Sequence, residues 1–167
     1  MYKRQGQFTW RADKSVLITV IKTAARETTV YVHDLDQAFI ANEKGSLPHN
    51  CPTGTVLLGQ MVVDFADGCY AARIMFFDVV SYGADDLRAM LPAARHSILR
   101  SDVAPLFQNS TDMSVQWVGF RSAAEDFCDQ SVRRSLPHDV ECVFLMPDDA
   151  PPGCMVPVRF FKQSPGP

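Results

Sequence analysis

The chain has 167 residues, of which 47% are hydrophobic and 21% charged, and its formal net charge is −3 at pH 7. This length and composition predict one globular domain spanning residues 1–167. The negative charge argues against a protein that coats nucleic-acid backbones, which needs many Lys and Arg side chains. The net charge is still compatible with a pocket that binds a single nucleotide. We expect residues 1–5 to be non-native and the native N-terminus to be missing.

The five cysteines contain no CxxC pair, and their number is odd. This pattern predicts neither a zinc site nor a disulfide framework, and it fits a reducing compartment. His49, His96 and His138 have no ligand-like spacing with the cysteines, so we expect no metal and no cofactor. No apolar run approaches about 18 residues, so we expect no membrane contact.

The first half of the chain reads as strands. Residues 15–22 and 28–33 are β-branched runs, and 42–54 is a polar loop. Residues 55–64 and 69–80 are two apolar runs joined by Asp67-Gly68, a strong hairpin signal. Gly59 inside the first of these runs indicates a bulge or a close approach of the backbone to a ligand.

The second half adds helices. Apolar residues at helical spacing predict a helix over 85–100, interrupted at Pro92, and its arginines are expected on a solvated face. A short strand over 115–120, a helix over 123–134 and two strands over 139–146 and 155–162 follow. This order predicts an α+β domain of twisted antiparallel sheets with flanking helices.

Four segments resemble, in order and spacing, the motifs of the nucleotidyltransferase superfamily, which includes mRNA guanylyltransferases and ATP-dependent ligases. The first, residues 9–21, resembles the strand that carries K-x-D-G, whose lysine is the covalent nucleophile. Arg11 stands at the lysine position, and arginine stays protonated. Lys14 is close, but it occupies the glycine position.

The second segment, residues 57–64, resembles L-D-G-E-[LM]-V. In the family the two acids contact the ribose and help to hold a metal. Leu58 and Gln60 replace them here, so the resemblance implies that Gln60 bonds a sugar hydroxyl but brings no charge to a metal.

The third segment, residues 75–88, resembles the family's aromatic strand, which implies that Phe76 or Phe77 stacks on a purine. One of the two is expected in the core, and Asp78 is retained. The fourth, residues 136–147, resembles E-V-D-G-L-I-F, with Glu141 and Cys142 at its aspartate and glycine. The resemblance also implies that Arg159 and Lys162 of the last strand contact phosphates.

The chain resembles the snurportins most, a branch of this superfamily that binds the trimethylguanosine cap of small nuclear RNA without catalysis. The spacing of the last strand implies that Phe160 stacks on the cap, and His33 lies near a phosphate-contacting position. Lys14, Arg159 and Lys162 are the expected phosphate contacts. The resemblance implies a cleft between the sheets, no catalytic residue, and a nuclear import adaptor that shuttles between nucleus and cytoplasm. Its partners would be small nuclear ribonucleoproteins and import and export receptors.

Two alternatives remain open. The chain would be a fragment of a divergent mRNA guanylyltransferase if Lys14 acts as a displaced nucleophile. The chain would also be consistent with a domain that has this fold but only binds other proteins. Each charged candidate has the simpler interpretation of a surface residue.

Overall fold

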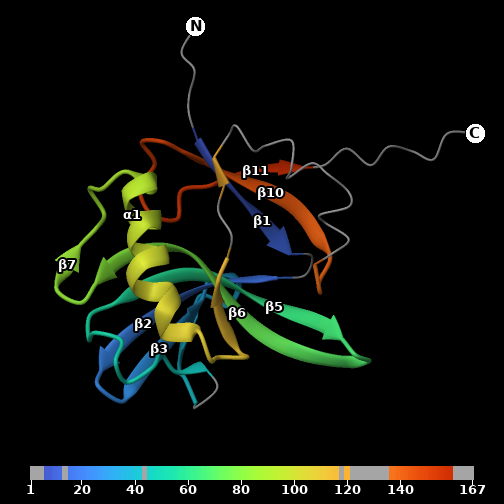
Figure 1. Cartoon of the computed structure of the whole chain (residues 1–167), viewed down its shortest axis with the longest axis horizontal. Helices are drawn as coiled ribbons and strands as arrows, with labels where there is room; N and C mark the ends of the chain where they lie inside the picture. The colour runs from blue at the N-terminus through green and yellow to red at the C-terminus, as the bar shows by residue number, and fades with distance from the viewer. Residues whose placement is uncertain (1–5, 13–14, 43–44, 117–118, 121–135, 160–167) are drawn as a thin grey trace, which may run out of the picture.

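The computed structural model describes residues 6–12, 15–42, 45–116, 119–120 and 136–159. Within these residues the chain is mostly β, with two sheets and one α-helix. Figure 1 shows the smaller sheet, with β1 and β10, above the larger one, with β2, β5 and β6. The helix lies along one side of both.

The larger sheet has seven strands in the order β4-β3-β2-β5-β6-β7, and β8 also pairs with β6. The β6–β8 pair is parallel and the other described pairs of this sheet are antiparallel, so the sheet is mixed. The antiparallel arrangement predicted from the sequence therefore needs correction at β8. The strands are β2 (Val16–Ala24), β3 (Glu27–Val32), β4 (Gln37–Ile40), β5 (Val56–Ala66), β6 (Cys69–Tyr82), β7 (Asp85–Asp86) and β8 (Met113–Val115).

The smaller sheet has the order β11-β10-β1-β9, and its pairs are antiparallel. The single strand predicted over 115–120 is thus two short strands, β8 and β9, which belong to different sheets. The strands are β1 (Gly6–Ala12), β9 (Gly119–Phe120), β10 (Val140–Pro147) and β11 (Val156–Arg159).

The β5–β6 hairpin is confirmed, with its turn at Asp67-Gly68. Both turn residues have positive φ, 53° and 78°, as the tight turns of hairpins require. Gly59 marks a bulge, because the register shifts between Leu58 and Gly59. A Cβ at Gly59 would lie 2.7 Å from the carbonyl oxygen of Met75, so the two backbones approach too closely for a side chain.

The helix α1 (Pro92–Ile98) begins later than predicted, because Asp85–Asp86 form the short strand β7 instead. Pro92 occupies the first turn, where its fixed φ and missing N–H cost nothing. A π-helical turn, Leu99–Val103, and a 3-10 turn, Ala104–Phe107, continue the segment. The helix predicted over 123–134 lies outside the described residues.

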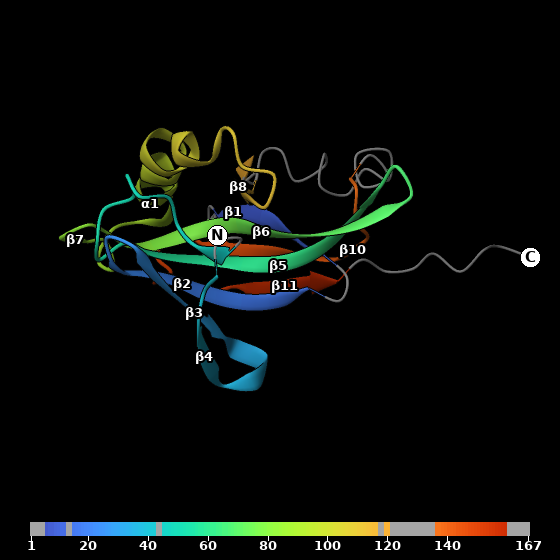
Figure 2. The same cartoon turned by 90° about the horizontal axis from the view of Figure 1, so that it is seen from below.

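The main core lies between the larger sheet and this helical segment, which Figure 2 shows on one side of β6. Alternate residues of the strands face it, as the period of two requires. Its buried members include Ile18, Val20, Leu57, Phe76, Val79, Leu99, Val103 and Phe107. Among the described helices, none has the length and apolar character needed to cross a bilayer.

Candidate functional site

Two glutamines form a buried hydrogen bond on the larger sheet. Gln60 lies in β5 and is 0% exposed, while Gln116 follows β8 and is 4% exposed. Gln60 Nε2 donates to Gln116 Oε1 at 2.5 Å. The main-chain N–H of Gln116 donates to the carbonyl of Phe76 at 2.7 Å. Gln116 is therefore held through its main chain and its side chain.

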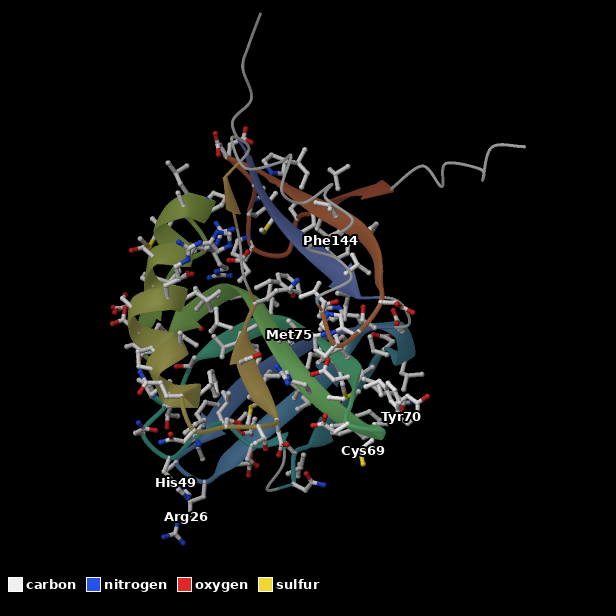
Figure 3. The ribbon with its side chains drawn as sticks, turned by 45° about the vertical axis from the view of Figure 1, so that its right-hand side comes forward. Arg26, His49, Cys69, Tyr70, Met75 and Phe144 are labelled. Carbon is white, nitrogen blue, oxygen red and sulfur yellow. The ribbon has the colours of Figure 1, made fainter. Side chains whose placement is uncertain are left out.

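Gln60 belongs to the face of the larger sheet that lies opposite the helix. Its register partners are Leu17 on β2 and Met75 on β6, and opposite residues of antiparallel strands project from the same face. Figure 3 shows Met75 on β6, with Phe144 on the neighbouring smaller sheet. We call the face of β2 and β5 that carries Leu17, Thr19, Leu58 and Gln60 the inner face.

The turn between β10 and β11 lies against the inner face. A Cβ at Gly153 would lie 3.0 Å from Leu58 Cδ1, and Gly153 has a φ of 77°. Its main-chain N–H also donates to Asp78 Oδ2 at 3.3 Å. The smaller sheet is thereby joined to the part of β5 that carries Leu58 and Gln60.

His33, a predicted phosphate contact, lies at the same face as Gln60. It follows β3 and forms a 2.8 Å hydrogen bond with Thr19 Oγ1. Its ring meets Tyr31 edge to face at 5.2 Å. Thr19 pairs with Leu58 in the β2–β5 register, two positions from the Leu17–Gln60 pair. Both His33 and Thr19 are accessible to a ligand at the edge of the inner face.

Ser15 is a buried polar residue next to the position of Lys14. It directly precedes β2 and is 4% exposed. Within the described residues, its Oγ has no hydrogen-bond partner. An unpaired buried hydroxyl costs about 1–3 kcal/mol, so a ligand that reached Ser15 would offset this cost. Sequence reasoning missed Ser15, because a single serine before a strand carries no pattern that predicts its burial.

The backbone brings the positions of Arg11 and Arg159 to either side of Cys142. Arg11 on β1 and Arg159 on β11 are both register partners of Cys142 on β10. The β1–β10 register shifts between Arg11 and Ala12, so that Glu141 is the extra residue of a bulge. Three other predicted site residues, Lys14, Phe160 and Lys162, lie outside the described residues.

The two aromatic candidates of β6 are buried. Phe76 is 0% exposed and stacks on Phe107, with ring centroids 5.3 Å apart. Its register partner is Gly59, so it projects from the opposite face to Gln60. The structure thus places Phe76 in the core. Phe77 is 3% exposed, and its carbonyl is 3.0 Å from His96 Nε2.

Asp78 forms a buried ion pair with Arg95 of α1. Arg95 donates from Nε to Asp78 Oδ1 at 2.9 Å and from Nη2 to Oδ2 at 3.0 Å. Its Nη1 bonds the carbonyls of Met90 at 2.6 Å and Ala150 at 3.2 Å. Arg95 is buried, so the expected solvated face of arginines is wrong at this position. The pair connects β6, α1 and the turn after β10.

A second charged cluster joins the tip of the β5–β6 hairpin to the start of β10. Asp64 Oδ1 is 2.7 Å from His138 Nδ1, and Asp64 Oδ2 is 2.9 Å from Arg73 Nε. The N–H of Phe65 also donates to the carbonyl of Pro137 at 2.8 Å. These contacts hold the two sheets together near the tip of the β5–β6 hairpin, away from the inner face. Within the described residues, no group of three or more His, Cys, Asp or Glu side chains could hold a metal.

Comparison with solved structures gives the fold. The ligase domain of LigD from M. tuberculosis superposes with a TM-score of 0.56 and 17% sequence identity, covering 92% of this chain and 50% of that one. A mycobacterial DNA ligase D complexed with ATP and MES gives a TM-score of 0.54 and 16% identity over the same shares. The chain therefore spans about half the length of these structures. No family model and no curated protein matches it. The chain therefore has the fold of about half of the DNA ligase D structures that it matches.

Proposed function

We propose that this protein binds the capped 5′ end of an RNA and does not catalyse nucleotidyl transfer. The cap would lie between the two sheets, over the inner face. The observation that carries this proposal is the pair of neutral amides, Gln60 and Gln116, at the place where the family has an acid. Two amides bond hydroxyl groups well, but they supply no negative charge to a metal ion.

The change at the nucleophile supports the same conclusion. Arg11 stands where the family has its reactive lysine, and a guanidinium does not deprotonate at any pH a protein tolerates. The positions of Arg11 and Arg159 flank Cys142 on either side of β10, and two guanidinium groups would suit an anionic ligand. The unpartnered hydroxyl of Ser15 adds a buried polar group that a ligand would satisfy.

The resemblance to snurportins suggests the biological setting. We propose a trimethylguanosine cap of small nuclear RNA as the ligand and a small nuclear ribonucleoprotein as the partner. The protein would act as a nuclear import adaptor that shuttles between nucleus and cytoplasm with import and export receptors. Phe160 would stack on the cap base, and His33, Lys14, Arg159 and Lys162 would contact phosphates.

Titration with trimethylguanosine and 7-methylguanosine cap analogues in magnesium-free buffer tests this proposal. Saturable binding to either analogue supports it. The variant Phe160→Ala should bind roughly ten to a hundred times more weakly, because an aromatic platform contributes about 1–3 kcal/mol per base. Phe39→Ala, which removes an exposed phenylalanine from the edge strand β4, is the matched control. No binding of either analogue at millimolar concentration would contradict cap recognition.

One alternative function has a specific observation in its favour. In the sequence, Lys14 directly precedes the unpartnered Ser15 and follows Arg11 by three positions, so it is near the family's nucleophile position in the motif. A divergent guanylyltransferase would use Lys14 as a displaced nucleophile. Incubation with radiolabelled GTP and magnesium, followed by denaturing electrophoresis, separates the two functions. A covalent guanylate that disappears in Lys14→Ala would favour the enzyme.

A further inference from the structure

The tip of the β5–β6 hairpin carries two aromatic side chains that lie outside the core. Phe65 and Tyr70 are register partners across the hairpin, with ring centroids 4.8 Å apart and ring planes tilted by 44°. They are 53% and 78% exposed. Figure 3 shows Tyr70 at the outer end of β6, away from the helix. Much of the surface of both rings is therefore open to a partner.

These two rings line a pocket of about 590 Å³, which we call the tip pocket. The segment before β10 also lines it, and the N–H of Phe65 holds this segment by donating to the carbonyl of Pro137 at 2.8 Å. A pocket of this volume lies within the range of small-ligand sites. The lining of the tip pocket includes Val63, Phe65, Tyr70, Pro137, His138 and Asp139.

The charged groups at the tip pocket favour a cation. Asp139 is exposed and forms no ion pair with a described residue. Arg73 pairs with Asp64 at 2.9 Å, so these two neighbouring charges compensate each other. Asp64 also contacts His138 Nδ1 at 2.7 Å, which places the proton of a neutral ring on Nδ1 and leaves Nε2 as an acceptor. The described lining contains no Lys or Arg.

We propose that the tip pocket binds an arginine side chain of a basic partner peptide. A guanidinium is planar, stacks on aromatic rings and donates several hydrogen bonds. Phe65 and Tyr70 provide the stacking surface, and Asp139 provides the counter-charge. A nucleic-acid backbone is disfavoured, because it needs Lys or Arg side chains. The net charge of the chain is −3, so a basic partner is attracted to it and a second copy is repelled.

NMR titration of the full chain with two capped pentapeptides, Gly-Gly-Arg-Gly-Gly and Gly-Gly-Leu-Gly-Gly, tests this proposal. The arginine peptide should shift the amide resonances of Phe65, Tyr70 and Asp139 in a saturable way. It should bind about tenfold more tightly than the leucine peptide, because a cation–π contact and an exposed ion pair are each worth about threefold.

Two variants separate the contributions of the ring and the charge. Tyr70→Leu keeps an apolar side chain and removes the ring, while Asp139→Asn removes the charge. Each should weaken binding of the arginine peptide about threefold, and the double variant should bind both peptides equally. Phe39→Leu and Asp148→Asn make similar changes at exposed positions outside the tip pocket and should keep the wild-type affinity.

Three results would overturn the proposal. These are equal affinities of the wild type for the two peptides, no shifts at the hairpin tip with millimolar arginine peptide, and a dimer of the chain that Tyr70→Leu disperses. The last result would show that a second copy occupies the tip pocket. The proposal is independent of cap binding, so Tyr70→Leu should bind a cap analogue as the wild type does. A chain that binds the cap but not the arginine peptide would overturn this proposal alone.

Discussion

Asp78 and Arg95 form a two-point ion pair in the interior, with N···O distances of 2.9 and 3.0 Å and both side chains 1% exposed. Asp78 also accepts from the main-chain N–H of Val79 at 2.9 Å and of Gly153 at 3.3 Å. Asp78 therefore connects α1 and the β10–β11 turn to β6, and it helps to hold the two sheets together.

Replacing Asp78 with Asn should lower the free energy of unfolding by about 3–5 kcal/mol, because Arg95 would remain buried without its counter-charge. Asp86→Asn is the matched control, since Asp86 forms a similar pair with Arg88 on the surface. The control should remain close to the wild type. Urea denaturation of the three proteins measures the effect, and equal losses in both variants would refute a structural role for the buried pair.

His96 should make stability depend on pH. Burial lowers the pKa of His96 to about 4, against an ordinary value of about 6.5. Between these two values the unfolded chain binds more protons than the folded chain, so stability falls as the pH falls through this window. The loss in the free energy of unfolding that is due to His96 should reach about 3 kcal/mol at the acid end of this window.

Urea denaturation from pH 4.5 to 7.5 measures this effect. His96→Gln keeps a donor for the carbonyl of Phe77 and should flatten the pH profile across the window. His49→Gln removes an exposed histidine and should leave the profile unchanged. Parallel profiles for the wild type and His96→Gln would show that His96 is not responsible.

The two glutamines should show coupled stability. Gln116→Leu and Gln60→Leu should each cost about 1–3 kcal/mol, because each leaves a buried amide without its partner. The double variant should be more stable than the sum of the two losses predicts, since both polar groups are then absent. A double-mutant cycle measures the coupling, and strict additivity would contradict the pairing of the two amides.

Gly59→Ala should destabilise the hairpin by about 1–3 kcal/mol, the usual cost of overpacking. The new methyl group would lie 2.7 Å from the Met75 carbonyl oxygen and 3.1 Å from Phe76 Cδ1. Gly45→Ala is a suitable comparison, because its methyl group would meet a methyl group, Ala41 Cβ, at 3.3 Å. Thermal unfolding of both variants checks the difference, and a neutral Gly59→Ala would mean that the bulge tolerates a side chain.

The β5–β6 hairpin was predictable because its signals are local. Its turn residues are Asp67 and Gly68, and the flanking runs are β-branched and apolar. Other features depend on contacts between distant residues. The four-residue strand β4 gave no signal, and α1 begins after the predicted start because Asp85–Asp86 pair with Ser81 and Tyr82.

The candidate site was predictable only in part, for the same reason. The position of Gln60 followed from its motif, but Gln116 is 56 residues away in sequence and lies in no motif. The helical spacing of arginines predicted a solvated face, whereas Arg95 reaches Asp78 across 17 residues. Phe76 and Phe77 could not be told apart by sequence, and the register with Gly59 assigns Phe76 to the core.

We propose that this ligase-like fold binds a nucleotide cap without transferring it. The most direct test is calorimetric titration of the wild-type chain with a trimethylguanosine cap analogue in buffer that contains EDTA. We predict saturable binding of one analogue per chain, unchanged when magnesium replaces EDTA. Binding that appears only with magnesium, or no binding at millimolar analogue, would contradict the account.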